Sequence, residues 1–212
     1  MKKPLVAVSA LTLALGGCAT RGEIDQTGGI TAVRSACPTV AIPAGTGDVT
    51  MFDAGTSQAE SALDVTATIT DLRSTCGDAG DQVNTQVTFN IIARRTRYDA
   101  ARDVVFPYFI TVVRGGTAVV AKRVGNVTVH FDAGQNRAQA AATGSSQIAR
   151  AAATLPEDVR KELTRRRKAG DQDAAVDPLS RPEVRQAVLN ATFETLVGFQ
   201  LTDDQLKYNA QR

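Results

Sequence analysis

The stretch Leu63-Asp64-Val65-Thr66-Ala67-Thr68-Ile69-Thr70 alternates apolar and polar side chains, and Val83-Asn84-Thr85-Gln86-Val87-Thr88-Phe89-Asn90-Ile91 follows nearly the same pattern. A period of two is typical of β-strands that bury one face. The segment 75–81 contains Gly and Asp and predicts a loop between these two strands. The two stretches therefore indicate that this part of the chain is built from antiparallel strands.

Further strand signals follow as far as residue 131. Val104–Val113 predicts a strand, in which Pro107 should lie at an edge or bulge because proline cannot donate to a ladder. Arg114-Gly115-Gly116-Thr117 predicts a hairpin, because paired glycines supply the positive φ of tight turns. A return strand is expected over 118–124, and 126–131 continues it or forms another.

These strands, with a weaker one around 39–42, predict an antiparallel β-sandwich of immunoglobulin-like type over residues 37–154. Closure into a barrel is the alternative. Residues 132–154 are rich in Ala, Gly, Ser and Gln, and they are open to two interpretations, a final strand around 138–150 or a loose loop.

Residues 155–212 contain the residue types that begin and end helices, and this segment is expected to pack on the sandwich. Pro156-Glu157-Asp158 opens a helix that basic residues close at Lys168, and 170–179 forms a polar linker. Ser180-Arg181-Pro182-Glu183 predicts a capping box for a second helix, which ends near Gly198. Alternation over 193–201 leaves a strand there as the rival interpretation. Thr202-Asp203-Asp204-Gln205 begins a short terminal helical turn.

The second predicted helix is apolar on two sides, so each side must pack against another part of the protein or against a partner. The bulky side is expected on the sandwich. The smaller side would meet the first helix, the tail or another protein, and is the candidate partner-binding surface: Val184, Ala187, Val188 and Ala191.

The chain begins Met1-Lys2-Lys3 and continues with an apolar run, Leu5–Leu15, that is too short to span a bilayer but suits a secretory signal. The run ends in Leu15-Gly16-Gly17-Cys18, which resembles the lipobox of bacterial lipoproteins. The resemblance implies cleavage after residue 17 and a diacylglycerol and an acyl chain on Cys18. In this class Ala19 implies sorting to the outer membrane, facing the periplasm.

Two or more acyl chains anchor a protein stably, and residues 18–36 are expected to form the lipidated tether. No later apolar run approaches the length of a membrane span. Export to an oxidising compartment favours a disulfide between the remaining cysteines, Cys37 and Cys76. A metal site or catalytic thiol is disfavoured, because the chain has one His and no CxxC motif.

The chemistry-bearing residues predict no enzyme, no cofactor and no metal site. His130 is the single His, and no GxSxG turn accompanies it, so a solvated or hydrogen-bonded strand histidine is expected. Loss of Lys2 and Lys3 leaves equal numbers of acidic and basic residues, which does not favour nucleic-acid binding. The densest basic run is either a solvated helix end or a contact for anionic lipid: Arg165, Arg166, Arg167 and Lys168.

More loosely, the chain resembles small outer-membrane lipoproteins of Gram-negative bacteria whose globular part is a binding module, and the ending 196–202 is similar to a tail found in such proteins. The resemblance implies membrane lipid and other envelope proteins as partners, and a non-catalytic scaffold or interaction module; some lipoproteins of this kind are accessories of outer-membrane assembly. The alternative is a carrier of lipid or another small apolar ligand in a cavity of the β-domain; a hydrolase is the weakest hypothesis.

Overall fold

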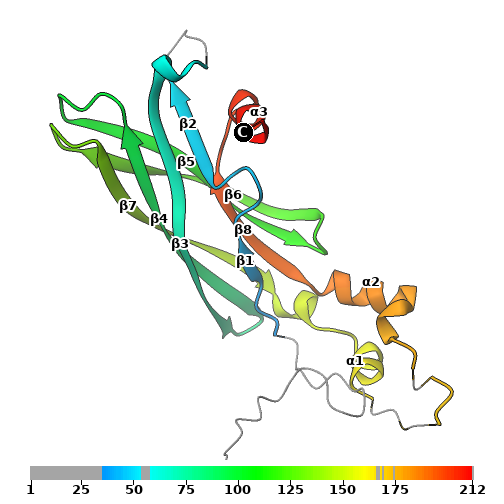
Figure 1. Ribbon diagram of the computed structural model, residues 1–212. Helices are drawn as coiled ribbons and strands as arrows, with labels where there is room; N and C mark the ends of the chain where they lie inside the picture. The colour runs from blue at the N-terminus through cyan, green and yellow to red at the C-terminus, as the bar shows by residue number, and fades with distance from the viewer. Residues whose placement is uncertain (1–34, 54–57, 166–167, 169, 174, 212) are drawn as a thin grey trace, which may run out of the picture.

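The computed structural model describes residues 35–53, 58–165, 168, 170–173 and 175–211 (Figure 1). Within these residues the fold is mainly β, with eight strands in two four-stranded sheets and three α-helices. The signal, Cys18 and most of the predicted tether lie outside the described residues.

The first sheet is antiparallel throughout and has the order β2-β3-β4-β7. Its strands are β2 (Asp48–Phe52), β3 (Leu63–Ala79), β4 (Gln82–Arg95) and β7 (Arg137–Ala149).

The second sheet has the order β1-β8-β5-β6, and β1 runs parallel to β8. Its strands are β1 (Thr39–Ala41), β8 (Phe193–Phe199), β5 (Arg102–Arg114) and β6 (Ala118–Phe131).

The core lies between the two sheets, because alternate residues of both contribute to one apolar cluster. The first sheet contributes Val65, Phe89 and Ile91, and the second contributes Phe131 and Val197, all at most 2% exposed. The expected sandwich-like, mainly β architecture is therefore present.

Strand β3 extends through most of the segment 75–81, so the loop prediction was correct only for its last two residues. Asp71, at φ 52°, marks an irregularity in the pairing of β3 with β4, after which the ladder continues from Arg73 to Ala79. Only Gly80 and Asp81 form the connection to β4. Gly and Asp stay in the strand because β4 satisfies their backbone groups.

Within 132–154, residues Arg137–Ala149 form strand β7, so the interpretation as a final strand was correct. Its inner face carries small residues because side chains of the opposite sheet need the space: a Cβ on Gly144 would lie 1.9 Å from Ile110 Cδ1. Ser146 is also buried and lies 2.9 Å from the Thr195 hydroxyl of β8. A strand of small residues thus seals one edge of the core.

The second predicted helix ends at Asn190, and the residues after it form β8. The prediction of a helix to Val197 was wrong, and the strand interpretation of 193–201 was correct. Gly198 is not a helix stop but a close-approach position, where a Cβ would lie 2.3 Å from Thr46 Oγ1. In β8 the buried face carries Phe193, Thr195 and Val197, whereas Leu196 lies on the other face and is only partly buried. A polar residue on the buried face and an apolar one on the other face obscure the alternation in the sequence.

The helices are α1 (Glu157–Thr164), α2 (Pro182–Asn190) and α3 (Asp203–Ala210). Helix α1 begins as predicted but ends before Arg165, so it does not extend to Lys168. The capping box predicted at Ser180 was wrong: Arg181 is the N-cap of α2 and makes no side-chain capping bond. The box at Thr202 and Gln205 is confirmed at the start of α3.

The hairpin at Gly115 and Gly116 is confirmed, with φ values of 62° and 78°. Its return strand is the single continuous β6. Pro107 lies in a central strand, contrary to expectation, but one residue before the stretch of β5 that pairs with β8. The Pro107 carbonyl accepts from the Gln200 N–H at 2.8 Å, just beyond the end of β8. The ladder with β8 begins at Tyr108, so the missing N–H of Pro107 removes no ladder bond.

The disulfide between Cys37 and Cys76 is present, with the Cα atoms 6.0 Å apart. It joins the segment before β1 to strand β3 and therefore links the two sheets covalently.

Candidate functional site

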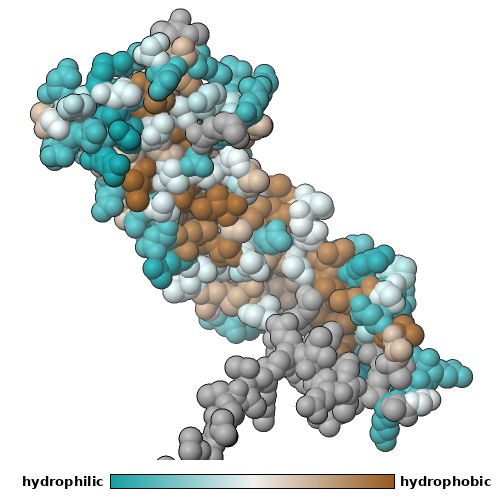
Figure 2. Space-filling view, in the orientation of Figure 1, coloured by the Kyte–Doolittle hydropathy of each residue, from teal (hydrophilic) through white to brown (hydrophobic). Residues whose placement is uncertain are grey.

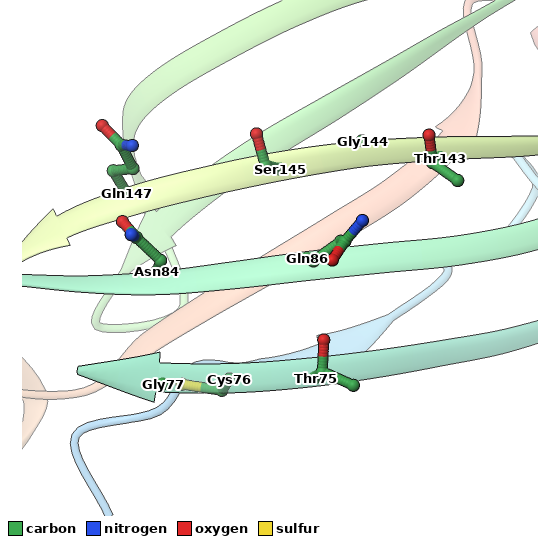
Figure 3. Close-up of a pocket in the computed structure, with 9 residues that line it drawn as sticks. All are labelled: Thr75, Cys76, Gly77, Asn84, Gln86, Thr143, Gly144, Ser145 and Gln147. Carbon is green, nitrogen blue, oxygen red and sulfur yellow. The ribbon is translucent and has the colours of Figure 1, made fainter. Parts of the chain in front are cut away.

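A trough of about 630 Å³ lies on the outer face of the first sheet, away from the core (Figure 3). The register places Gln86 between Thr75 and Ser145, and Asn84 between Gly77 and Gln147. The period of two turns these side chains outward. The trough is lined by amides, hydroxyls and backbone, together with the disulfide-bonded Cys76.

The side chains of this trough can donate and accept hydrogen bonds, but none is an acid, a base or a free thiol. General acid–base catalysis needs a group that titrates near the working pH. The trough is consequently a candidate for binding neutral polar groups and not for proton transfer.

A second hollow of about 240 Å³ lies where the described chain begins, between Ala36 and Cys37 on one side and Val188, Ala191 and Phe193 on the other. A third, of about 280 Å³, lies between β2 and α3. All three of these hollows are at the surface, and none lies between the two sheets.

The predicted partner-binding stripe is largely an internal contact. Val184 and Val188 are buried in a small cluster with Leu163 of α1, whereas Ala187 and Ala191 are partly exposed. Of the three alternatives for this side of α2, contact with the first helix is the one observed. Val184 and Val188 therefore do not form a free docking surface, because α1 covers them.

The basic run predicted for anionic lipid is partly used within the chain. Arg165 contacts the carboxylates of Glu162 and Asp173, and Arg181 donates to Glu162 at 3.0 Å. The backbone N–H of Lys168 donates to Asp171. Arg166 and Arg167 lie outside the described residues. Because acidic neighbours offset the charge of Arg165, the described part of the run is not an isolated cationic patch.

His130 is exposed and hydrogen-bonded, as expected. Its Nδ1 lies 2.6 Å from Asp103 Oδ1, and its Nε2 lies 3.4 Å from Asp132 Oδ1. The hydrogen bond to Asp103 is the main cause that raises the pKa of His130. Both ring nitrogens face carboxylates, whereas a serine-type triad needs one of them to face the nucleophile.

A charged cluster missed by sequence reasoning closes the end of the sandwich opposite to α1 and α2. Arg95 is 3% exposed and donates to the carbonyls of Ala100 and Asp132 at 2.7 and 2.8 Å. Arg102 donates to Asp64 at 2.8 Å, and this contact holds the pKa of Asp64 below its usual value. The alternation of β4, which turns Arg95 inward after Ala93, was the available signal.

An apolar band marks the open side of the sandwich, where β1 and β2 are short. Figure 2 shows it as brown surface in the middle of the molecule, between polar ends. Several side chains packed against the core are only partly buried: Val40, Ile42, Met51 and Leu72.

A second exposed apolar region is the first half of β6. Residues 118–124, here called the β6 arm, are all exposed, and Val119, Val120 and Val124 are 63%, 51% and 59% exposed. Lys122 lies over the Phe109 ring at 5.3 Å. β6 is the last strand of its sheet, so in the described chain the arm is paired on one side only. The sequence predicted this strand but not its exposure.

In the part of the chain that the structure describes, no three His, Cys, Asp or Glu side chains gather as a metal site would require. No helix among the described residues is long and apolar enough to cross a bilayer. No protein-family model, curated protein or solved structure matches this chain.

Proposed function

We propose that this chain is a lipid-anchored, non-catalytic interaction module of the bacterial outer membrane, which binds another envelope protein through the β6 arm. The observation that supports docking most directly is the exposure of Val119, Val120 and Val124 on an edge strand. Exposed apolar patches on otherwise well-packed domains commonly mark interaction sites.

The proposed lipid anchor is supported by the signal-like start of the chain and by the sequence Leu15-Gly16-Gly17-Cys18. The Cys37–Cys76 disulfide supports the same compartment, because disulfides persist mainly outside the reducing cytoplasm. The diacylglycerol and acyl chain on Cys18 would confine the domain to the periplasmic face of the outer membrane.

For the fold, the proposal is a reduced immunoglobulin-like sandwich. The order β3-β4-β7 corresponds to strands A-B-E of that fold, and the pair β5-β8 corresponds to C-F. The chain departs from the antibody pattern in having no Trp and in placing its disulfide before β1 and in β3. Domains of this architecture often present strands and loops to partners.

The carrier alternative has less support. A ligand carrier needs an apolar cavity of roughly 300 Å³ or more, but the 630 Å³ trough is lined by amides and hydroxyls on an outer face. Between the sheets, Val65, Val87 and Val129 are fully buried by packing. These observations favour the interaction module.

The anchor is tested with Cys18→Ala. The variant should leave the membrane fraction, because it lacks the thiol that accepts the lipid. Cell fractionation and immunoblotting measure this, and Ser35→Ala provides a control that should stay membrane-bound. Retention of Cys18→Ala in the membrane would overturn the anchor.

The docking surface is tested by in-cell photocrosslinking from Val120 and Val124. Both positions should yield the same discrete protein adduct. A probe at Thr88, exposed on β4 of the other sheet and outside the trough, is the matched control and should not yield that adduct. The docking surface is wrong if the two β6 positions give no adduct, or if the control gives the same one.

A further inference from the structure

The β6 arm lies at the edge of its sheet, where a further strand could be added on the side away from β5. In an antiparallel pair, alternate residues direct their N–H and C=O groups away from the partner strand, so an edge strand presents a row of unpaired groups. β5 pairs with β6 from Ala118 to Phe131, with one register shift at which Val120 has no opposite residue in β5. The opposite edge of the arm has no partner strand among the described residues. An added strand would satisfy these groups and cover the exposed valines.

The charges on and near the β6 arm favour some partner strands over others. Between Asp103 and Asp132 the chain contains no Asp or Glu, but it contains Arg114, Lys122 and Arg123. Arg114 stacks on Phe193 and donates to Asn190, so it is used locally. Lys122 lies over the Phe109 ring, but within the described chain neither Lys122 nor Arg123 is found in an ion pair. The arm therefore offers two adjacent cations on an otherwise apolar edge.

A second copy of this chain is a poor match. Two β6 arms paired antiparallel would bring Lys122 and Arg123 of both copies into one short ladder, where like charges are destabilising. Lysine on an edge strand is a common safeguard against such self-association. An acidic strand instead turns these cations into favourable cross-strand pairs.

We infer that the β6 arm binds its partner by strand addition, and that the partner contributes an extended apolar segment with adjacent carboxylates facing Lys122 and Arg123. This inference deepens the proposed function and rests on it. Backbone hydrogen bonds would contribute affinity, and the carboxylates would set the register and exclude basic or self-complementary strands.

The test uses the purified full chain in a neutral detergent and two labelled peptides, each roughly ten residues long. Both peptides alternate threonine and valine; one has two adjacent glutamates at its centre, and the other has two lysines there. Fluorescence anisotropy should show the acidic peptide binding at least about tenfold more tightly at low salt. Lys122→Glu with Arg123→Glu should reverse the preference, and Arg137→Glu on β7 should leave it unchanged.

Hydrogen–deuterium exchange distinguishes strand addition from simple charge attraction. Bound acidic peptide should slow amide exchange within 118–124, because alternate N–H groups there become hydrogen-bonded. Equal binding of the two peptides, or binding without slower exchange in the arm, overturns the inference. Stronger protection of the arm by short-chain phosphatidylglycerol than by the acidic peptide also overturns it, as does self-association through the arm in sedimentation. A crosslinked partner from Val120 together with any of these outcomes would leave the proposed function standing and remove only the strand-addition mechanism.

Discussion

Arg95 organises the loops at one end of the sandwich. Besides the carbonyls of Ala100 and Asp132, its Nε donates to the carbonyl of Gln135 at 2.9 Å, and its guanidinium lies 5.0 Å from the centre of the Phe131 ring. A buried cation is costly unless hydrogen bonds replace its hydration. Here backbone carbonyls supply those bonds, so the arginine and the loops depend on one another.

Arg95→Ala should therefore lower the free energy of unfolding by about 3 kcal/mol, because it removes charged hydrogen bonds and leaves buried carbonyls unpaired. Urea denaturation measures the change. Arg94→Ala, on the exposed face of the same strand, is the matched control and should change stability by less than about 0.5 kcal/mol. Equal effects from the two variants would show that Arg95 is not the organising residue.

His130 should titrate with a pKa above its ordinary value of 6.5, mainly because of its hydrogen bond to Asp103. The raised pKa favours the protonated ring in the folded state, so the contribution of this pair to stability is fully present below pH 6.5 and is lost as pH rises through the folded pKa. NMR titration of the ring measures the pKa. Asp103→Asn should return it toward 6.5, and Asp132→Asn should lower it less. Equal shifts would contradict the assigned cause.

At the scale of elements, β7 and β8 show why two segments were hard to assign from their sequence alone. β8 lies between β1 and β5, with one face buried throughout and the other partly buried. Its Phe193, Leu196 and Val197 also have the spacing of a helical stripe. β7 has small residues, which have weak strand propensity. Both become strands because neighbouring strands supply their hydrogen bonds.

The buried hydroxyl pair of Ser146 and Thr195 links these two strands across the sandwich. Thr195→Val should cost about 1–2 kcal/mol of stability, because the Ser146 hydroxyl loses its partner in the core. Adding Ser146→Ala should recover part of this loss, because no unpaired hydroxyl then remains. A double-mutant cycle by thermal or urea unfolding measures the coupling. Strictly additive effects would contradict a direct bond.

At the scale of the whole molecule, the Cys37–Cys76 disulfide holds the start of the second sheet to the first. Its cysteines are 39 residues apart in sequence, and a small apolar cluster surrounds that end of the sandwich: Val83, Val112, Ile148 and Phe193. The loop that the bond closes restricts the unfolded chain, which is the main source of disulfide stabilisation in the chain-entropy description.

Replacing both cysteines, as Cys37→Ser with Cys76→Ser, should lower the free energy of unfolding by about 4 kcal/mol. Urea unfolding of the variant should match that of the reduced wild-type chain, and mass spectrometry without reductant should show the link in the wild type. Two free thiols in the native protein, or an unchanged unfolding midpoint in the variant, would be incompatible with this role.

Local sequence was sufficient for features that involve near neighbours. The alternation of β3 and β4, the Gly115-Gly116 turn and the capping box at Thr202 were all predicted, because each depends on the preferences of a few consecutive residues. The number of cysteines was enough to predict the disulfide, because only Cys37 and Cys76 remain after the lipidated Cys18 is set aside.

Long-range contacts decided the rest. They made 193–199 a central strand, turned the small residues of β7 into a sealed edge of the core, and covered Val188 with α1 while leaving Val120 exposed. A local pattern shows which residues share a face, but burial of that face depends on segments distant in the sequence. The physical reason is that burial free energy belongs to the contact between two surfaces, and the sequence of one surface does not specify the other.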